Sequence, residues 1–186
     1  YLLPEISLTT QITDRLRSVF GSQLMVYHSK FNDNERAETW QSLLSKDECK
    51  IVLGARSAIF VPFRKLGLII VDEEHEASYK QQDPSPRYNA KNAAIVLAGI
   101  TQSKVLLGTA TPSIETYYNA LNGRFGLVTL TKRYADIELP EIITVNTKDL
   151  RKRKLMKTIL SPPLVDEMKV ALSKHEQIIL FQNRRG

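Results

Sequence analysis

Cysteine is nearly absent from this 186-residue chain, in which Cys49 is the single example. One cysteine can form neither an internal disulfide nor a zinc site built from cysteines, and it fits a reducing, cytoplasmic compartment. Long apolar runs are missing too, because stretches such as 67–71 fall far short of the about 18 residues that a membrane span needs. The sequence contains no positively charged segment followed by an apolar run, which is the pattern of a signal peptide. We therefore expect no disulfide scaffold and no membrane association.

The composition is otherwise ordinary for a folded protein, with 42% apolar and 25% charged residues, and this excludes disorder for most of the chain. The net charge of +6 is unevenly spread, since residues 1–130 carry 14 basic and 13 acidic groups and residues 131–186 carry 12 and 7. A basic excess of this kind indicates either a polyanionic partner or a solvated basic face. Charge alone leaves both interpretations open.

Short runs of β-type residues recur along the chain and predict strands at 24–27, 50–54, 67–71, 104–108, 127–131, 142–146 and 177–182. Several runs are apolar at consecutive positions, which favours strands covered on both faces of a parallel sheet. Helical stretches are expected between them, at 7–21, 33–44, 91–99, 113–123 and 162–174. This alternation predicts an α/β fold with a doubly wound parallel sheet.

A change in composition near Thr131 indicates a boundary between two parts of the chain. We expect residues 1–131 to form one α/β lobe, and residues 132–186 to supply a linker and an incomplete second lobe. The basic stretch 148–157 has the composition of an exposed linker, and residues 76–90 show no clear period. The opening residues Tyr-Leu-Leu are typical of the end of a strand that begins earlier in the sequence, so we interpret the chain as a piece of a larger protein.

The strongest local signal is a run of acids that directly follows the apolar stretch 67–71, beginning with Asp72 and Glu73. A buried strand that ends in acids places carboxylates at the carboxyl edge of a sheet, where α/β proteins bind ligands. The first carboxylate can hold Mg²⁺, and the second can orient or deprotonate an attacking water. The alternative is that both acids only cap the strand.

Three further turns combine a strand end with small polar residues. They are Thr109–Ser113, Ala55–Ala58 with Arg56 and Ser57, and Pro4–Thr9. Each can be a plain helix cap, and each can also contact phosphate through hydroxyls and helix-start amides. Since all of these turns are predicted at the same sheet edge as the acids, they form one candidate site.

At these residues the sequence resembles a known family. Asp72–His75 and Gly108–Ser113 resemble motifs II and III of superfamily 2 helicases, and Pro4–Thr9 and Gly54–Ala58 resemble motifs Ia and Ic. A more specific match is to the primosomal replication-restart helicases. They are resembled by the run from Asp72 to Gln82, followed by Pro86-Arg87-Tyr88 and by Asn183–Gly186. The resemblance covers essentially the whole chain and implies a RecA-like first lobe that lacks its first strand and phosphate loop.

The resemblance implies an ATP-driven 3′-to-5′ DNA helicase that acts at stalled replication forks in primosome assembly. It assigns Asp72 to the Mg²⁺ of ATP, Glu73 to the hydrolytic water, and His75 to communication with Thr109 and Thr111. Single-stranded and forked DNA, the primosome and single-strand-binding proteins would be the partners. The implied DNA-binding residues are Pro4, Arg56, Ser57, Tyr79, Lys80, Arg87, Tyr88, Arg184 and Arg185.

The departures from the family pattern are equally informative. The chain contains no Gly-Lys pair and hence no phosphate-binding loop of the Gly-x-x-x-x-Gly-Lys-Ser/Thr type. The family's zinc-binding cysteines are also missing, so zinc is expected only in a part of the protein beyond this chain. We therefore predict that the isolated chain neither hydrolyses ATP nor unwinds DNA. Another superfamily 2 translocase and a non-catalytic interaction module are the alternative interpretations.

Overall fold

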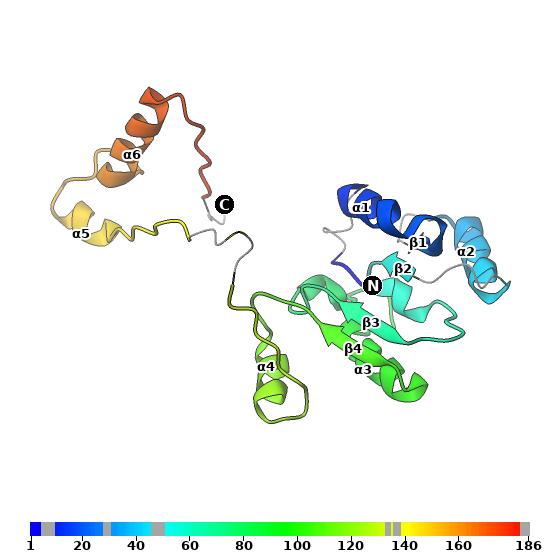
Figure 1. Ribbon diagram of the computed structural model, residues 1–186. Coiled ribbons are helices and arrows are strands. Elements are labelled where there is room, and N and C mark those ends of the chain that lie inside the picture. Colours follow the sequence, from blue (N-terminus) through cyan, green and yellow to red (C-terminus); the bar gives the residue numbers. More distant parts are fainter. Residues whose placement is uncertain (5–9, 28–30, 46–50, 133–134, 136–138, 183–186) are drawn as a thin grey trace. The chain divides into compact units, whose positions relative to one another are not determined.

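A computed structural model describes the chain except for residues 5–9, 28–30, 46–50, 133–134, 136–138 and 183–186. The chain divides into two compact units, Tyr1–Val128 and Thr129–Gly186. The first unit contains all of the regular strands among the described residues, and both units contain helices (Figure 1).

Two pairs of parallel strands make up the sheet of the first unit. β1 (Leu24–Tyr27) pairs with β2 (Ile51–Gly54), and β3 (Leu68–Val71) pairs with β4 (Lys104–Leu107). The opening segment joins the two pairs, because Leu2 forms parallel bridges to both Gly54 and Val71. The Leu2 amide donates to the main-chain oxygen of Ile70 at 2.7 Å. The predicted α/β class with parallel strands is therefore confirmed.

The helices of the first unit are α1 (Thr10–Phe20), α2 (Asp33–Ser45), α3 (Ala90–Thr101) and α4 (Ile114–Leu121). Local sequence explains where two of them begin. Asn32 and Glu35 form a reciprocal capping box at the start of α2, with bonds of 2.8 and 2.9 Å. Asn89 caps α3 by accepting from the Asn92 amide. Short 3₁₀ turns lie at η1 (Gly21–Gln23), η2 (Arg56–Phe60) and η3 (Ala77–Tyr79).

Alternating strand residues point to two separate apolar clusters, which lie on the two faces of the sheet. One cluster combines Leu2, Val52 and Ile69 with η2 and with Ala94 of α3. The other combines Leu3, Leu53 and Leu24 with Ile12 and Leu16 of α1. Figure 1 shows α1 and α3 on opposite sides of the strands. Helices thus cover both faces, as expected for a doubly wound sheet.

The second unit contains α5 (Thr147–Lys152) and α6 (Pro162–Ser173). Part of the predicted linker 148–157 is therefore helical, because Asn146 caps α5 by accepting from the amides of Lys148 and Asp149. The strands predicted at 127–131, 142–146 and 177–182 are wrong. Their apolar residues have no neighbouring strand in the described part of the chain, and Leu130, Ile142 and Ile179 are 90%, 82% and 95% exposed. A single strand cannot satisfy its backbone groups or bury a face.

No helix among the described residues is long and apolar enough to cross a membrane.

Candidate functional site

The carboxyl ends of β3 and β4 carry the candidate site. The turn Asp72–His75 follows β3 directly, and its shape is set by Glu73, which adopts a left-handed backbone with a φ of 47°. The Glu73 amide donates to Asp72 Oδ1 at 3.0 Å, so Asp72 caps its own turn. The Tyr1 hydroxyl donates to Asp72 Oδ2 at 2.8 Å. Burial, together with this bond to Asp72, raises the pKa of the Tyr1 hydroxyl to about 12.

The turn after β4 meets the acidic turn at His75. His75 Nδ1 lies 2.8 Å from the Thr109 hydroxyl, and its ring nitrogens lie 3.4 and 3.5 Å from the Thr111 hydroxyl. The Thr111 amide donates to Thr109 Oγ1 at 3.0 Å, which orders the threonine turn itself. The structure therefore brings His75, Thr109 and Thr111 together, as the resemblance predicts.

Glu74 was missed by sequence reasoning, although it is the most buried acid of the turn. Its side chain is fully shielded from solvent and pairs with Lys91 at 2.7 Å. Burial tends to raise the pKa of this carboxyl, but the bonds from Lys91, Ser113 and Thr116 outweigh it and leave the pKa below its ordinary value. No local pattern could have revealed the cluster, because its members are spread over more than 40 positions of the chain.

Tyr79 is buried, which contradicts the prediction that it contacts DNA. Its side chain is 1% exposed and belongs to the core beneath the sheet edge. The hydroxyl donates to the main-chain oxygen of Asp72 at 2.6 Å and to that of Leu2 at 3.0 Å. Stacking on an unpaired base requires an accessible ring face, so the prediction that Tyr79 contacts DNA is wrong for this conformation. The residue links the loop after the acids to the acidic turn instead.

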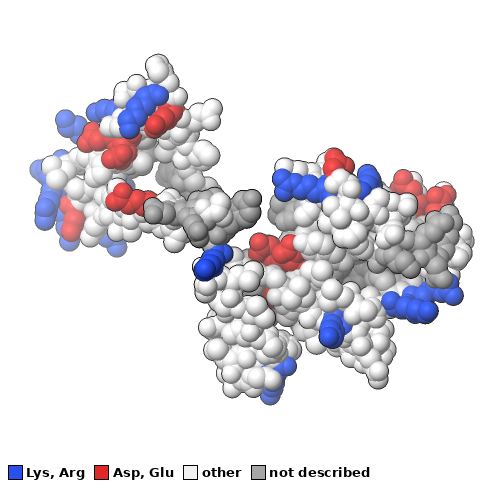
Figure 2. Space-filling view, viewed as in Figure 1, with Lys and Arg blue, Asp and Glu red and all other residues white. Residues whose placement is uncertain are grey.

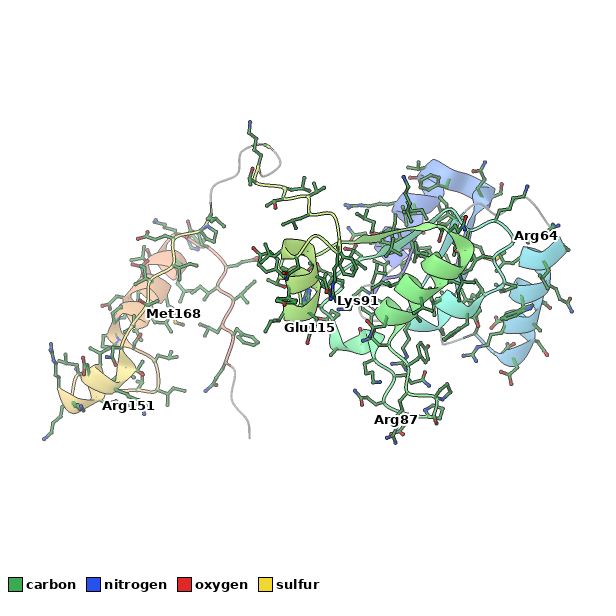
Figure 3. The ribbon with its side chains drawn as sticks, turned by 90° about the horizontal axis from the view of Figure 1, so that it is seen from below. Arg64, Arg87, Lys91, Glu115, Arg151 and Met168 are labelled. Carbon is green, nitrogen blue, oxygen red and sulfur yellow. The ribbon has the colours of Figure 1, made fainter. Side chains whose placement is uncertain are left out.

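Lys80 and Arg87 lie on an exposed hairpin-like loop, which is closed by a bridge between Lys80 and Asn89. The Lys80 amine donates to the main-chain oxygen of Arg87, and Arg87 pairs with Asp83 at 3.1 Å. Figure 3 shows Arg87 at the end of a loop that projects away from the body of the unit. Both cations are thus held apart from the core and face solvent.

The remaining residues that were predicted to contact DNA differ in how far they are exposed. Arg56 donates to the Ser78 oxygen at 3.3 Å, and the Tyr88 ring packs edge-on against Phe60 with centroids 4.7 Å apart. Burial raises the pKa of Tyr88, although the nearby Arg56 opposes this shift. Arg56, Ser57 and Tyr88 are half-buried and Pro4 is buried. The predicted contacts at Arg184 and Arg185 lie outside the described residues.

The carboxylate oxygens of Asp72 and Glu73 suit a magnesium ion better than a metal that needs many protein ligands. No group of three or more His, Cys, Asp and Glu residues that could enclose a metal exists among the described residues. Mg²⁺ is commonly held by one or two carboxylates, with phosphate oxygens and water completing its shell. The half-exposed Asp72 and Glu73 fit that pattern. In Figure 2, one acidic patch of the first unit lies on the side toward which the arrows of β3 and β4 point in Figure 1, and other acidic side chains lie over α1 and α2.

A cavity of about 710 Å³ lies at the opposite edge of the sheet. It is bordered by Ile51 and Leu68, which stand at the amino ends of β2 and β3, and also by Tyr1, whose hydroxyl reaches Asp72. Ligands of α/β sheets bind at the carboxyl ends. Most of the cavity therefore lies away from the strand ends that carry the candidate site, and Tyr1 borders both.

Comparison with known proteins gives two findings. A family model described as "DEAD/DEAH box helicase" matches residues 1–120. Proteins named "Replication restart protein PriA" from Rickettsia felis and Bacillus subtilis are each 42% identical to this chain, over 186 and 185 residues. The matches cover 100% of this chain but only 28% and 23% of those two proteins. The resemblance stated from the motifs is confirmed, and the chain spans about a quarter of the length of these relatives.

Proposed function

The chain belongs to the DEAD/DEAH box helicase family, and we propose on that premise that it forms part of an ATP-dependent 3′-to-5′ DNA helicase acting in replication restart. The observation that carries the proposal is the 2.8 Å contact between His75 and Thr109. This contact joins the acidic turn after β3 to the hydroxyl turn after β4, at the sheet edge where a nucleotide would bind. The similarity to replication restart proteins over the whole chain supports the choice of process.

Asp72 and Glu73 have separate roles in this proposal. Asp72 lies nearer the strand and would hold Mg²⁺, which when bound neutralises charge on the phosphates of ATP. Glu73 follows in a left-handed turn and would orient the attacking water and accept its proton. His75, Thr109 and Thr111 would communicate the presence of bound nucleotide between the acidic turn and the threonine turn.

The two parts of the chain take separate places in this proposal. Residues 1–131 would be the first helicase lobe, and residues 132–186 would be the linker and the start of the second lobe.

The proposed DNA contacts rely on the projecting loop. Lys80 and Arg87 are exposed there and would contact phosphates, while the half-buried Arg56, Ser57 and Tyr88 would contribute from the base of the loop. Pro4, Arg184 and Arg185 complete the proposed single-strand track by resemblance. Forked DNA, the primosome and single-strand-binding proteins are the proposed partners, and a cytoplasmic location belongs to the same proposal.

ATP hydrolysis would require residues from outside this chain. The sequence has no Gly-Lys pair, and the phosphate-binding loop and its lysine hold the β- and γ-phosphates in such enzymes. The 186-residue chain by itself is therefore expected to be inactive. Zinc is proposed only for the part of the protein beyond this chain.

The test is ATP hydrolysis, measured with and without single-stranded DNA, on the longer protein that contains this chain and on the chain alone. The longer protein should show DNA-stimulated hydrolysis, and the chain alone should show none. Glu73→Gln should reduce turnover at least about 100-fold while leaving nucleotide binding in place, and Asp72→Asn should weaken the response to Mg²⁺. Glu115→Gln, an exposed acid on α4, is the matched control and should behave as wild type.

A non-catalytic interaction module is the second candidate. The observation that favours it is that both oxygens of Asp72 already accept bonds, from Glu73 and Tyr1. Absence of hydrolysis in a correctly folded longer protein would support this candidate and would leave the acids as caps. Hydrolysis stimulated by RNA but not by DNA would support a different superfamily 2 translocase.

A further inference from the structure

Glu74 is the one buried carboxylate among the described residues, with 2% of its surface exposed. A buried charge is costly unless donors surround it. Glu74 Oε1 accepts from the Ser113 amide at 2.6 Å, and Oε2 accepts from Lys91 at 2.7 Å. The hydroxyls of Ser113 and Thr116 each lie 2.9 Å from Oε2. The carboxylate is therefore fully hydrogen-bonded inside the protein.

Lys91 completes the cluster from α3. Its amine has three hydrogens, and three acceptors surround it: Glu74 at 2.7 Å, Ser113 at 2.9 Å and Thr116 at 3.1 Å. Figure 3 shows Lys91 reaching toward α4, the helix that carries the labelled Glu115. Since α3 begins right after the projecting loop, the cluster connects that loop, the acidic turn and the start of α4.

The main chain of Glu74 makes a second contact with the same turn. Its amide donates to the Gly108 oxygen at 3.1 Å, while its carboxylate accepts from the Ser113 amide. Gly108 and Ser113 stand on either side of the threonine turn, so a single residue binds both of its ends. Thr109 and Thr111 lie between these two anchors, and His75, which contacts them, is the next residue after Glu74.

We propose that Glu74 is a positioning residue: with Lys91, it clamps both ends of the turn 109–112 so that Thr109 and Thr111 are held against His75. The inference rests on the proposed function for its consequence in ATP hydrolysis, but the clamp itself is a property of the fold. Glu74 touches no reacting atom and acts through His75 and the threonine turn.

Hydrogen–deuterium exchange on the longer protein tests the clamp without any need for activity. In Glu74→Gln the amides of the turn, including Thr111, should exchange at least about tenfold faster than in wild type, because the charged side-chain anchor to Ser113 and Lys91 is weakened while the main-chain bond to Gly108 remains. Glu115→Gln removes a carboxylate from the same helix start and should leave exchange unchanged. Equal exchange in Glu74→Gln and Glu115→Gln would overturn the proposal, whether or not the protein hydrolyses ATP.

ATP hydrolysis supplies the second readout. Glu74→Gln should lower the DNA-stimulated kcat about tenfold and change the KM for ATP less than about twofold, as expected for lost positioning rather than lost binding. If Glu74→Gln fails to fold, Thr116→Val keeps the ion pair and replaces one hydroxyl by a methyl of equal size. This milder variant should lower the DNA-stimulated kcat about threefold and speed exchange of the turn.

A double-variant cycle distinguishes positioning from general destabilisation. If the clamp acts through Thr109, then Thr116→Val should add little to the loss of kcat already caused by Thr109→Val. Fully multiplicative losses would contradict the proposal, since they would show that the two residues act independently. A wild-type protein without hydrolysis would refute the proposed function alone, and the exchange experiment would still decide the clamp.

Discussion

Tyr79 donates its phenolic hydroxyl to the main-chain oxygen of Asp72 at 2.6 Å, and the same hydroxyl reaches the Leu2 oxygen at 3.0 Å. One buried side chain thus joins the loop after the acids to the acidic turn and to the segment that completes the sheet. Burial raises the pKa of Tyr79 above its ordinary value, so the hydroxyl keeps its proton and remains a donor at neutral pH.

Replacing this hydroxyl should destabilise the fold without removing the ring from the core. Tyr79→Phe should lower the free energy of unfolding by about 1–3 kcal/mol, because the Asp72 oxygen loses the hydroxyl as a donor and the Leu2 oxygen keeps only the Asp72 amide. Urea unfolding followed by circular dichroism measures the change. Tyr118→Phe removes a hydroxyl from a side chain that is 63% exposed and should cost less than about 0.5 kcal/mol. Equal effects of the two variants would contradict the role given to the Tyr79 hydroxyl.

The buried Glu74 predicts a loss of stability in acid. Its pKa lies below the ordinary value of 4.5 in the folded protein, so the unfolded chain binds the proton more readily. The stabilisation is therefore complete above about pH 5 and is lost as pH falls through the folded pKa. Unfolding measured between pH 3 and 7 should show this loss in wild type and a weaker pH dependence in Glu74→Gln. Unchanged pH profiles would argue against a charged, paired Glu74.

Two glycines predict stability changes of opposite sign. A Cβ at Gly54 would lie 2.3 Å from the Tyr27 oxygen and 2.6 Å from the Ala58 Cβ, so Gly54→Ala should destabilise by about 3 kcal/mol or more. A Cβ at Gly99, inside α3, would meet nothing within 4 Å. Gly99→Ala should therefore stabilise by about 0.5–1 kcal/mol through helix propensity. Thermal unfolding of both variants tests the signs, and a stabilised Gly54→Ala would refute the close packing of β1 against β2.

The projecting loop predicts a salt-dependent contact with single-stranded DNA. Lys80→Ala combined with Arg87→Ala should reduce the slope of log affinity against log salt by about 1.4, or about 0.7 for each lost phosphate contact. Fluorescence anisotropy with a labelled oligonucleotide at several salt concentrations measures the slope in the longer protein. Lys65→Ala combined with Lys104→Ala is the control, because both lysines are exposed at the amino edge of the sheet. A slope altered equally by both pairs would show general charge attraction instead of contact at the loop.

Local signals accounted for most of the first unit. Consecutive apolar residues correctly placed the strands β1, β2, β3 and β4, and the capping residues Asn32 and Asn89 stand where α2 and α3 begin. The carboxyl-edge rule was enough to bring the acidic turn and the threonine turn together, because parallel strands that are neighbours end at the same edge. The same apolar signals failed from residue 127 onward, where the three predicted strands have no partner among the described residues.

The sequence by itself determined the order of β1 to β4 and of the helices between them, and the pair of turns that meet at His75, since these depend on periodicity, capping and the common direction of parallel strands. Only the tertiary structure decided which polar residues are buried. Tyr79 was an implied DNA contact and proved to be a core donor, and Glu74, to which the sequence assigned no role, proved to be a buried anchor. Their environments depend on Leu2, Lys91 and Ser113, which are distant in sequence, and burial and hydrogen bonding are set by such long-range contacts.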